Sequence, residues 1–428
     1  MEEHRYYIPW NEAAVFMKKA FVKLDMPEKD AEICVDVLLE SDRRGIESHG
    51  CNRFKPIYID RILDGILNPI TNFEIIRETA TTAVVDGHDG MGMVISHKAM
   101  KIAIEKAKKY GMGMVVVRNS SHYGIAGYYA SMAAAQDMIG ITGTNARPSV
   151  APTFGVENMM GTNPLTFGMP TDEEFPFILD CATSTCQRGK IELYNREGKK
   201  TPQGLVISEK GERLTDSEEI LNALEKGTAA LTPLGGVGEA LGGYKGYGYT
   251  TVVEILSSAL QAGSFMKSLS GYDAEGLKIP YHLGHFFMAV DIEAFMGADV
   301  FKKITGDILR ELRSSKKAQG EERIYTAGEK EYLKSLEREN TGIPIGKEIQ
   351  KEFIETKANL SGVSLTSYKV VKPESFAYVT VTSRNSDRIT MAYNRTEDTY
   401  IVSSSYIVFN IAKPELLNPE YLFMFFER

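Results

Sequence analysis

The stretch MVVVRNSSHYGIAGYYASMAAAQDMIGITGTN, residues 114–145, decides the fold class. It begins with an apolar run typical of a buried strand, and the run 138–142 is typical of the next strand. Between them, the residues from Gly124 and Ala126 onward favour a helix. A strand, a helix and another strand in this order predict an α/β fold.

His122 lies in the polar cluster between the first of these strands and the helix. Ligands bind at the carboxyl ends of strands in α/β sheets, and a histidine there can accept a proton near neutral pH. The position alone leaves two interpretations open. His122 is either a proton-transfer residue or a side chain that caps the start of the helix.

Composition limits the classes of function. The chain has 428 residues, enough for two or three domains, and its 43% hydrophobic and 25% charged residues are ordinary for a globular protein. The net charge of −8 gives no general attraction to nucleic acid or anionic membranes. The acidic N-terminus, MEEHRYYIPW, does not resemble a signal peptide, and no apolar run is long enough for a membrane helix. We therefore expect a cytoplasmic protein.

The four cysteines, Cys34, Cys51, Cys181 and Cys186, are expected to be reduced thiols. Cys181 and Cys186 are five residues apart, which is not a zinc-site spacing, and no second pair completes a site. We expect no bound metal.

A polar elbow, GIESHGCNR, joins two predicted N-terminal helices to the next helix. Its Ser48, His49 and Arg53 are close in sequence, and a helix that begins near Gly50 would turn Arg53 toward the others. Hydroxyl, imidazole and guanidinium groups together make a good carboxylate receptor. The plainer alternative is a capping cluster with a surface arginine.

Two glycine-rich stretches lack the usual dinucleotide fingerprint. In the first, Ile95 stands where the third glycine would be, and in the second Leu241 does. Residues 180–184 follow a predicted strand, and their small and hydroxyl side chains leave room for a ligand. Lys245 is surrounded by glycine and aromatic residues, so it is either a mobile phosphate or carboxylate ligand or an ordinary solvated lysine. We expect a helix at 250–262 and a turn-rich surface excursion at 190–230.

Six stretches in order resemble the malate/L-lactate dehydrogenase family that is distinct from the Rossmann-type lactate and malate enzymes. They are RGIESHGCNRF, RNSSHYGIAGYY, GTNPLTF, DCATS, LGGYKGYG and GHFFMAVD. The resemblance covers about residues 5–350, and we assign residues 1–350 to one dehydrogenase-like domain. It implies a large mixed sheet with N-terminal helices, an unconventional nicotinamide-binding mode and a homodimer whose active sites lie near the interface.

The resemblance also implies roles for individual residues. It makes His122 the general base on the substrate hydroxyl, and it places Ser48, His49 and Arg53 on the substrate carboxylate. The cofactor would lie along Asn145, Ala146, Asp180, Cys181, Ala182 and Lys245. The substrate would be a small 2-hydroxy acid of the malate, lactate, ureidoglycolate or sulfolactate type. The cofactor is expected to be NAD, with NADP open.

Residues 351–428 form a second, β-rich region that resembles part of the DNA target-recognition domain of a type I restriction–modification specificity subunit. This region has nine Lys and Arg and nine Asp and Glu residues, which is not the basic patch of a DNA binder. Three functions therefore compete: a hydroxy-acid dehydrogenase, a DNA-recognition module, and a cyclic-imine reductase on the dehydrogenase scaffold. We favour the dehydrogenase and expect no DNA partner.

Overall fold

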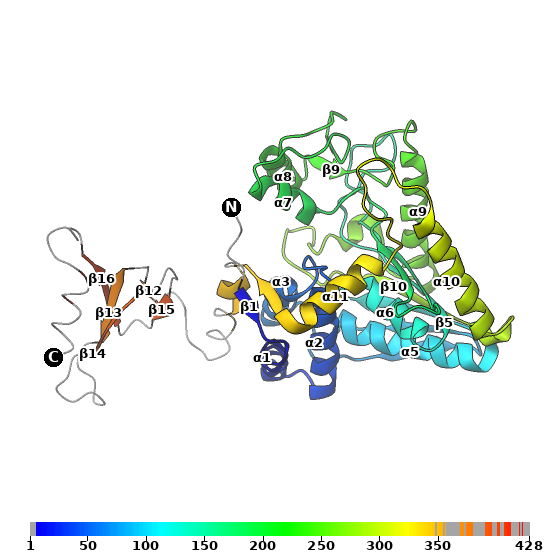
Figure 1. Ribbon diagram of the computed structural model, residues 1–428, viewed down its shortest axis with the longest axis horizontal. Helices are drawn as coiled ribbons and strands as arrows, with labels where there is room; N and C mark the ends of the chain where they lie inside the picture. The colour runs from blue at the N-terminus through cyan, green and yellow to red at the C-terminus, as the bar shows by residue number, and fades with distance from the viewer. Residues whose placement is uncertain are drawn as a thin grey trace. The chain divides into compact units, whose positions relative to one another are not determined.

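The computed structural model describes residues 6–346, 349–353, 356, 369–371, 374–379, 390–395, 400–402, 406–411, 419 and 422. The chain divides into two compact units, residues 1–349 and 350–428. Each unit is described by itself. Figure 1 gives the element labels.

A seven-stranded mixed sheet is the centre of the first unit, as the sequence predicts. Its only parallel pair among the described strands is β3 with β4, and every other neighbouring pair is antiparallel. The strand order is β2 (Glu74–Glu78), β3 (Thr82–Asp86), β4 (Met112–Ser120), β10 (Leu283–Asp291), β5 (Met138–Thr144), β6 (Leu165–Met169) and β7 (Phe177–Cys181).

Helices lie on both faces of this sheet. The helices α5 (Gly92–Tyr110) and α6 (Ala126–Ala134) pack on one face, where Val115, Val117 and Phe287 are fully buried in the main core. On the other face, α9 (Gly243–Leu256) contributes Val253 to a smaller core. Figure 1 shows α9 and α10 (Ala298–Ser314) on the side of the sheet opposite to α6.

The N-terminal helices are α1 (Trp10–Lys23) and α2 (Glu28–Arg43). After the elbow come α3 (Cys51–Arg53), a π-helical turn (Phe54–Ile59) and α4 (Asp60–Leu63). The unit ends with α11 (Glu329–Thr341) and β11 (Ile343–Ile345), which pairs with β1 (Tyr6–Ile8). No helix in the described part of the chain is long and apolar enough to cross a membrane.

Two sequence-based predictions are wrong. The region 190–230 is not only turns, because it contains α7 (Arg188–Arg196), β8 (Val206–Ser208), α8 (Ser217–Lys226) and β9 (Ala229–Leu231) around a core of their own. The helix predicted from residue 250 begins seven residues earlier, so Lys245 lies in the first turn of α9 rather than in a loop. Tight packing explains the second difference, since a Cβ on Gly246 would lie 2.2 Å from the carbonyl oxygen of Leu234.

The described segments of the second unit are mostly strands, as the sequence predicts. They form a two-stranded sheet of β12 (Lys369–Val371) and β15 (Tyr400–Val402). A three-stranded sheet contains β13 (Ser375–Val379) between β14 (Thr390–Tyr393) and β16 (Tyr406–Asn410). Its Phe376 is fully buried and stacks on the rings of Tyr393 and Phe409.

Candidate active site

The predicted site residues gather at one edge of the sheet. The strands β4, β5 and β7 run in the same direction, because β10 and β6 separate them with antiparallel pairings. Their carboxyl ends, Ser120, Thr144 and Cys181, therefore lie at the same edge. His122 follows the first of these strands and Asn145 the second.

Scaffold contacts fix the end of β4. The side chains of Arg118 and Asn119 both donate to the carboxylate of Asp86, with N···O distances of 2.8–3.1 Å. The Ser120 hydroxyl lies 2.8 Å from Nε2 of the fully buried His285, and Ser121 Oγ donates to the carbonyl oxygen of Gly90. These four polar side chains of the cluster are thus bonded to neighbouring elements.

The glycine-rich stretch Asp89–Gly92, which precedes Ile95 and lacks the dinucleotide fingerprint, allows a helix to begin close to the end of a strand. A Cβ on Gly92 would lie 2.2 Å from the carbonyl oxygen of Ser121, so only glycine allows α5 to begin this close to the end of β4. Its N–H also donates to Ser121 Oγ at 2.8 Å. The glycines therefore bring a helix against the strand that carries His122.

The His122 ring is held at one nitrogen only. Its Nδ1 lies 2.6 Å from the hydroxyl of Tyr58, and the backbone N–H of Gly124 approaches the same nitrogen at 3.3 Å. No described residue bonds Nε2, so this atom is available to a ligand. The helix α6 has Ile125 at its N-cap and no side-chain cap, so His122 is not a helix cap.

The elbow meets His122, as the resemblance implies. The rings of His49 and His122 stack with their centroids 5.7 Å apart and an angle of 17° between planes. Ser48 Oγ lies 2.8 Å from His49 Nδ1, and Arg53 Nε donates to the carbonyl oxygen of Ser48 at 2.7 Å. The two terminal nitrogens of Arg53 have no bond to a described residue. No side chain of the elbow caps α3, which leaves the carboxylate-receptor interpretation standing.

Burial and positive charge keep both histidines neutral. The pKa of His122 lies well below its ordinary value because the protein excludes water from the ring, and the nearby His49 ring and the charged Arg53 disfavour the protonated form further. Burial, with a smaller effect of Arg53, lowers the pKa of His49 to about 4. A neutral imidazole is the form that accepts a proton.

The residues predicted along the cofactor differ in what their side chains do. The Asn145 side chain is fully buried, donates to the carbonyl oxygen of Ser264 and accepts from the N–H of Gly284. The N–H of Ala146 donates to Asn163 Oδ1 at 3.1 Å. The side chain of Asn145 therefore holds the loop. Its backbone N–H also donates to the carbonyl oxygen of Gly284, and its carbonyl oxygen accepts from the Thr144 hydroxyl.

Asp180 bonds the first turn of α6. Its carboxylate accepts from the N–H of Gly127 at 2.7 Å and from the hydroxyl of Thr166 at 3.0 Å. Burial raises its pKa, and these two bonds partly oppose that rise. Asp180 thus fixes the helix that follows His122, while Cys181 and Ala182 beside it are half-buried.

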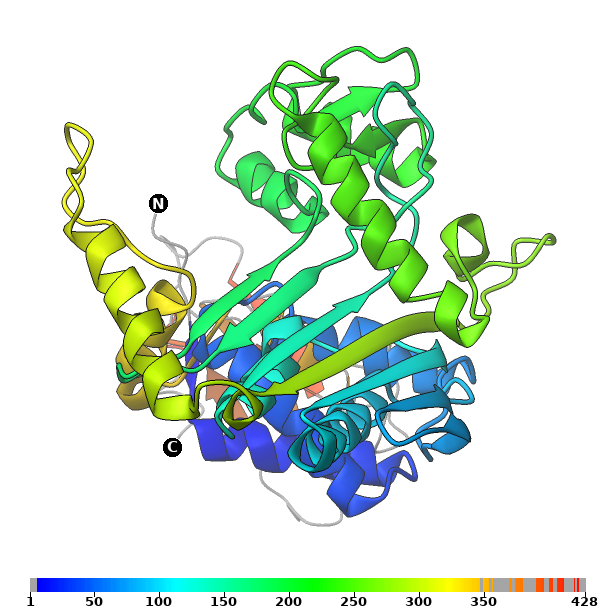
Figure 2. The same ribbon diagram turned by 90° about the vertical axis from the view of Figure 1, so that its right-hand side faces the viewer.

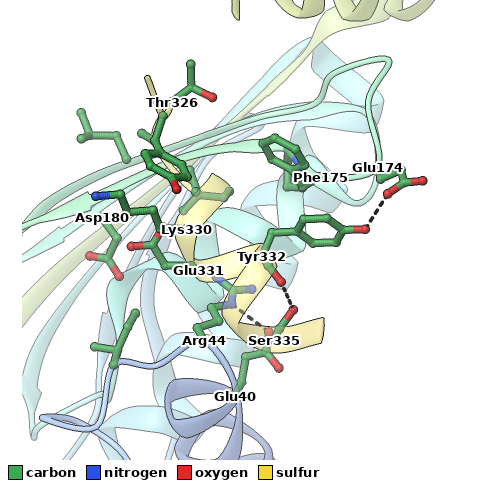
Figure 3. Close-up of a pocket in the computed structure, with 17 residues that line it drawn as sticks. Glu40, Arg44, Glu174, Phe175, Asp180, Thr326, Lys330, Glu331, Tyr332 and Ser335 are labelled. Carbon is green, nitrogen blue, oxygen red and sulfur yellow. Dashed lines mark hydrogen bonds and ion pairs between the residues drawn. The ribbon is translucent and has the colours of Figure 1, made fainter. Parts of the chain in front are cut away.

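Asp180 also lines a pocket of about 450 Å³ between β7, α2 and α11. Figure 3 shows Lys330 and Glu331 of α11 on the same side of this pocket as Asp180. Tyr332 and Arg44 line it further along, and Tyr332 Oη donates to Glu174 at 2.8 Å. Charged groups from several elements therefore face this hollow.

Lys245 stands apart from these contacts. It is exposed in the first turn of α9, and its Nζ lies 5.8 Å from the centre of the Tyr244 ring. No described carboxylate pairs with it. In the part of the chain that the structure describes, no group of three or more His, Cys, Asp or Glu residues is arranged to hold a metal ion.

Sequence reasoning missed Tyr58, which touches His122 from a position 64 residues earlier. It also missed Arg61 and Tyr281, whose guanidinium carbon and ring centre are 3.7 Å apart. None of the three belongs to one of the six stretches quoted above. Tyr58 lies five residues after Arg53 in the π-helical turn Phe54–Ile59, and an α-helical spacing of three or four residues would not bring these two side chains to one face.

The comparison with protein families agrees with this geometry. The model of the malate/L-lactate dehydrogenase family matches residues 8–353. The chain belongs to this family. Members are oxidoreductases that act on small hydroxy acids with a nicotinamide cofactor, so this chain is a hydroxy-acid dehydrogenase.

Family members with similar sequences align over most of their length. The malate dehydrogenase of Pyrococcus abyssi is 45% identical over 355 residues, which are 83% of this chain and 95% of the relative. The L-sulfolactate dehydrogenase of Methanocaldococcus jannaschii is 36% identical over 348 residues, or 81% and 94%. The crystal structure of malate dehydrogenase from Entamoeba histolytica has a TM-score of 0.81 at 44% identity, covering 84% of this chain and 99% of that one.

The competing functions gain no support. The Δ1-piperideine-2-carboxylate reductase of Pseudomonas syringae has a TM-score of 0.70 at 22% identity, which shows a shared fold alone. The family match ends at residue 353. The likeness of residues 351–428 to a restriction specificity subunit stays a prediction, and most of those residues lie outside the described part of the chain.

Proposed function

We propose that this dehydrogenase oxidises malate-type 2-hydroxy acids with His122 as the general base. The observation that carries the proposal is the contact between two segments distant in sequence, with the His122 and His49 rings 5.7 Å apart. Arg53 presents its two terminal nitrogens to the substrate carboxylate, and Ser48 and His49 bond neighbouring oxygens. The similar proteins given above carry the name malate dehydrogenase at 45% and 44% identity and sulfolactate dehydrogenase at 36%.

The chemistry needs a base at one substrate atom. His122 Nε2 takes the hydroxyl proton, and the hydroxyl of Tyr58 stays bonded to Nδ1 because it can donate to the neutral ring or accept from the protonated ring. The nicotinamide cofactor, when bound, accepts the hydride from the carbon that bears this hydroxyl group. Arg53 fixes the face that the substrate presents, since its guanidinium fork binds a carboxylate in one orientation.

The cofactor residues suit a dinucleotide. Lys245 has no carboxylate partner among the described residues and lies in the first turn of a 14-residue helix, whose N–H groups and dipole favour phosphate. Three further places are candidates for contacts with the dinucleotide: the loop after β5, the segment after β7 and the pocket beside Asp180. We propose NAD as the cofactor, because a relative at 26% identity, the ureidoglycolate dehydrogenase (NAD(+)) of Escherichia coli, carries this cofactor in its name.

We also propose a homodimer. The helix α10 exposes Ile304, Ile308 and Leu312 to 53–54%, and an apolar groove of about 730 Å³ runs beside it. The helix α9 exposes Val252 and Ile255 on the same side of the sheet. Figure 2 shows sheet strands between α9 and α10 with no helix across them. Apolar surface of this extent usually marks an interaction site.

The test is an absorbance assay at the nicotinamide band. Malate, lactate, ureidoglycolate and sulfolactate are offered with NAD or NADP, together with a cyclic imine for the reverse direction. We expect malate and NAD to give the highest kcat/KM. His122→Ala should lower kcat by about 10²- to 10⁴-fold while NADH still binds, because the base is lost but the cofactor contacts remain. A variant with near wild-type turnover would remove His122 from the mechanism.

A further inference from the structure

Three arginines surround the site without a counter-ion. Arg53, Arg61 and Arg147 form no ion pair with any residue that the structure describes. Arg61 is only 9% exposed, which is unusual for an arginine that lacks a carboxylate partner. A buried cation without a carboxylate partner is unfavourable, and the neighbouring guanidinium groups repel it, so the arrangement gains stability when an anion enters.

Two contacts place Arg61 beside the proposed base. Tyr58 bonds His122 Nδ1 at 2.6 Å, and Arg61 follows Tyr58 by three residues in continuous helical structure. The Arg61 guanidinium lies 3.7 Å from the centre of the Tyr281 ring. His122 and Tyr281 each lie two residues beyond the paired Ser120 and Leu283, on the same side of that pair.

Arg147 reaches the same aromatic ring from another element. It follows β5, its guanidinium carbon is 5.8 Å from the centre of the Tyr281 ring, and Nη1 lies 3.5 Å from the ring's hydroxyl. Tyr281 thus holds two guanidinium groups, one buried and one exposed. One N–H of Arg61 donates to the carbonyl oxygen of Ile279 at 3.3 Å, and its other donors have no partner among the described residues.

We propose that Arg61 and Arg147 form a second anion subsite, which binds the distal acidic group of a dianionic 2-hydroxy acid. Arg53 holds the carboxylate next to the reacting carbon, and the second subsite receives a carboxylate or a sulfonate at the far end. The subsite selects dianionic substrates against lactate-type substrates. This inference rests on the proposed function, because it divides one substrate between two cationic groups.

The electrostatics favour an anion beside these arginines. Burial lowers the pKa of Arg61, and the positive charge of Arg147 lowers it further while the Tyr281 ring raises it. Arg61 is also among the charges that lower the pKa of His122. A bound dianion would relieve this repulsion at both ends of the site.

The test compares substrates that differ at the far end. Malate, sulfolactate and 2-hydroxybutyrate are oxidised by the wild type, Arg61→Gln, Arg147→Gln and Arg61→Lys. We expect the wild type to favour malate over 2-hydroxybutyrate by at least about 100-fold in kcat/KM. Arg61→Gln should reduce malate oxidation by about 10- to 100-fold, the range of a lost charge-assisted hydrogen bond, and leave 2-hydroxybutyrate within threefold.

Controls separate the possible outcomes. Arg147→Gln changes an exposed residue, so it should fold normally and show a smaller loss in the same direction. Arg61→Lys should recover part of the malate activity, and Arg77→Gln on exposed β2 should change nothing. The ratio of kcat/KM for sulfolactate to that for malate shows whether the subsite prefers a sulfonate or a carboxylate. Equal losses for both malate and 2-hydroxybutyrate, or a wild type without preference, would overturn the subsite. A wild type that oxidises no hydroxy acid would instead overturn the proposed function.

Discussion

At the residue scale, the proposed chemistry depends on the protonation state of His122. His122 has its Nδ1 bonded to Tyr58 and its Nε2 open, and its environment disfavours the protonated ring. The sequence placed His122 at the end of a strand, and β4 does end at Ser120. It did not give Tyr58, Arg61 or Tyr281, because their contacts with the site join residues far apart in the chain and follow no local motif.

The lowered pKa of His122 predicts the pH profile of hydroxy-acid oxidation. The base must be neutral, and its free-enzyme pKa lies below the ordinary 6.5, so the neutral form persists as pH falls toward and past that value. The kcat/KM for malate should stay level from about pH 8 down to 6.5 and decline only at lower pH. A half-maximal value above pH 7 would contradict this assignment. The profile is measured at saturating NAD.

The elbow shows how elements act together. Asp42, at the end of α2, accepts from the N–H of Cys51 in the first turn of α3 at 2.8 Å. Burial raises the Asp42 pKa to about 7. Arg338 of α11 donates to the backbone oxygen of Asp42 and to the carboxylate of Glu47. Contacts from α2 and α11 therefore fix the conformation of the elbow.

Gly50→Ala should damage substrate binding through this elbow. A Cβ at residue 50 would lie 2.0 Å from Asp42 Oδ1, so the elbow must move. Displacement of about 1 Å can cost about 100-fold in rate, and we expect a loss of at least tenfold in kcat/KM with unchanged NADH affinity. Gly189→Ala in α7 is the matched control, since its Cβ would meet nothing within 4 Å. Equal kinetics for both variants would show that the elbow tolerates the shift.

Prediction from sequence succeeded for elements whose own pattern was strong and failed where packing decides. The apolar runs of β4 and β5 predicted two strands of the sheet. The start of α9 did not follow from its sequence, because GGYKGYG has low helix propensity and is helical only where glycines meet other backbone segments. The small core around α7 and α8 joins residues 150–231, which no local pattern marks.

At the scale of the whole molecule, we place the interface of the proposed homodimer on α10. Ile304→Asp with Ile308→Asp should convert a dimer into monomers, because two charges would then have to be buried in an apolar contact. Size-exclusion chromatography with light scattering gives the mass. Val15→Asp, on an exposed position of α1, is the control and should stay dimeric. A monomeric wild type would refute the proposed dimer.

The pairing of β1 with β11 joins the two ends of the dehydrogenase unit, and Trp10 Nε1 donates to the carbonyl oxygen of Arg338 beside it. Arg338 of α11 also donates the hydrogen bonds to Asp42 and Glu47 that hold the elbow. During synthesis on a ribosome, the proposed substrate receptor therefore cannot be complete until almost the last residues of this unit have been made. A nascent chain contains His122, the proposed base, long before it can form that receptor.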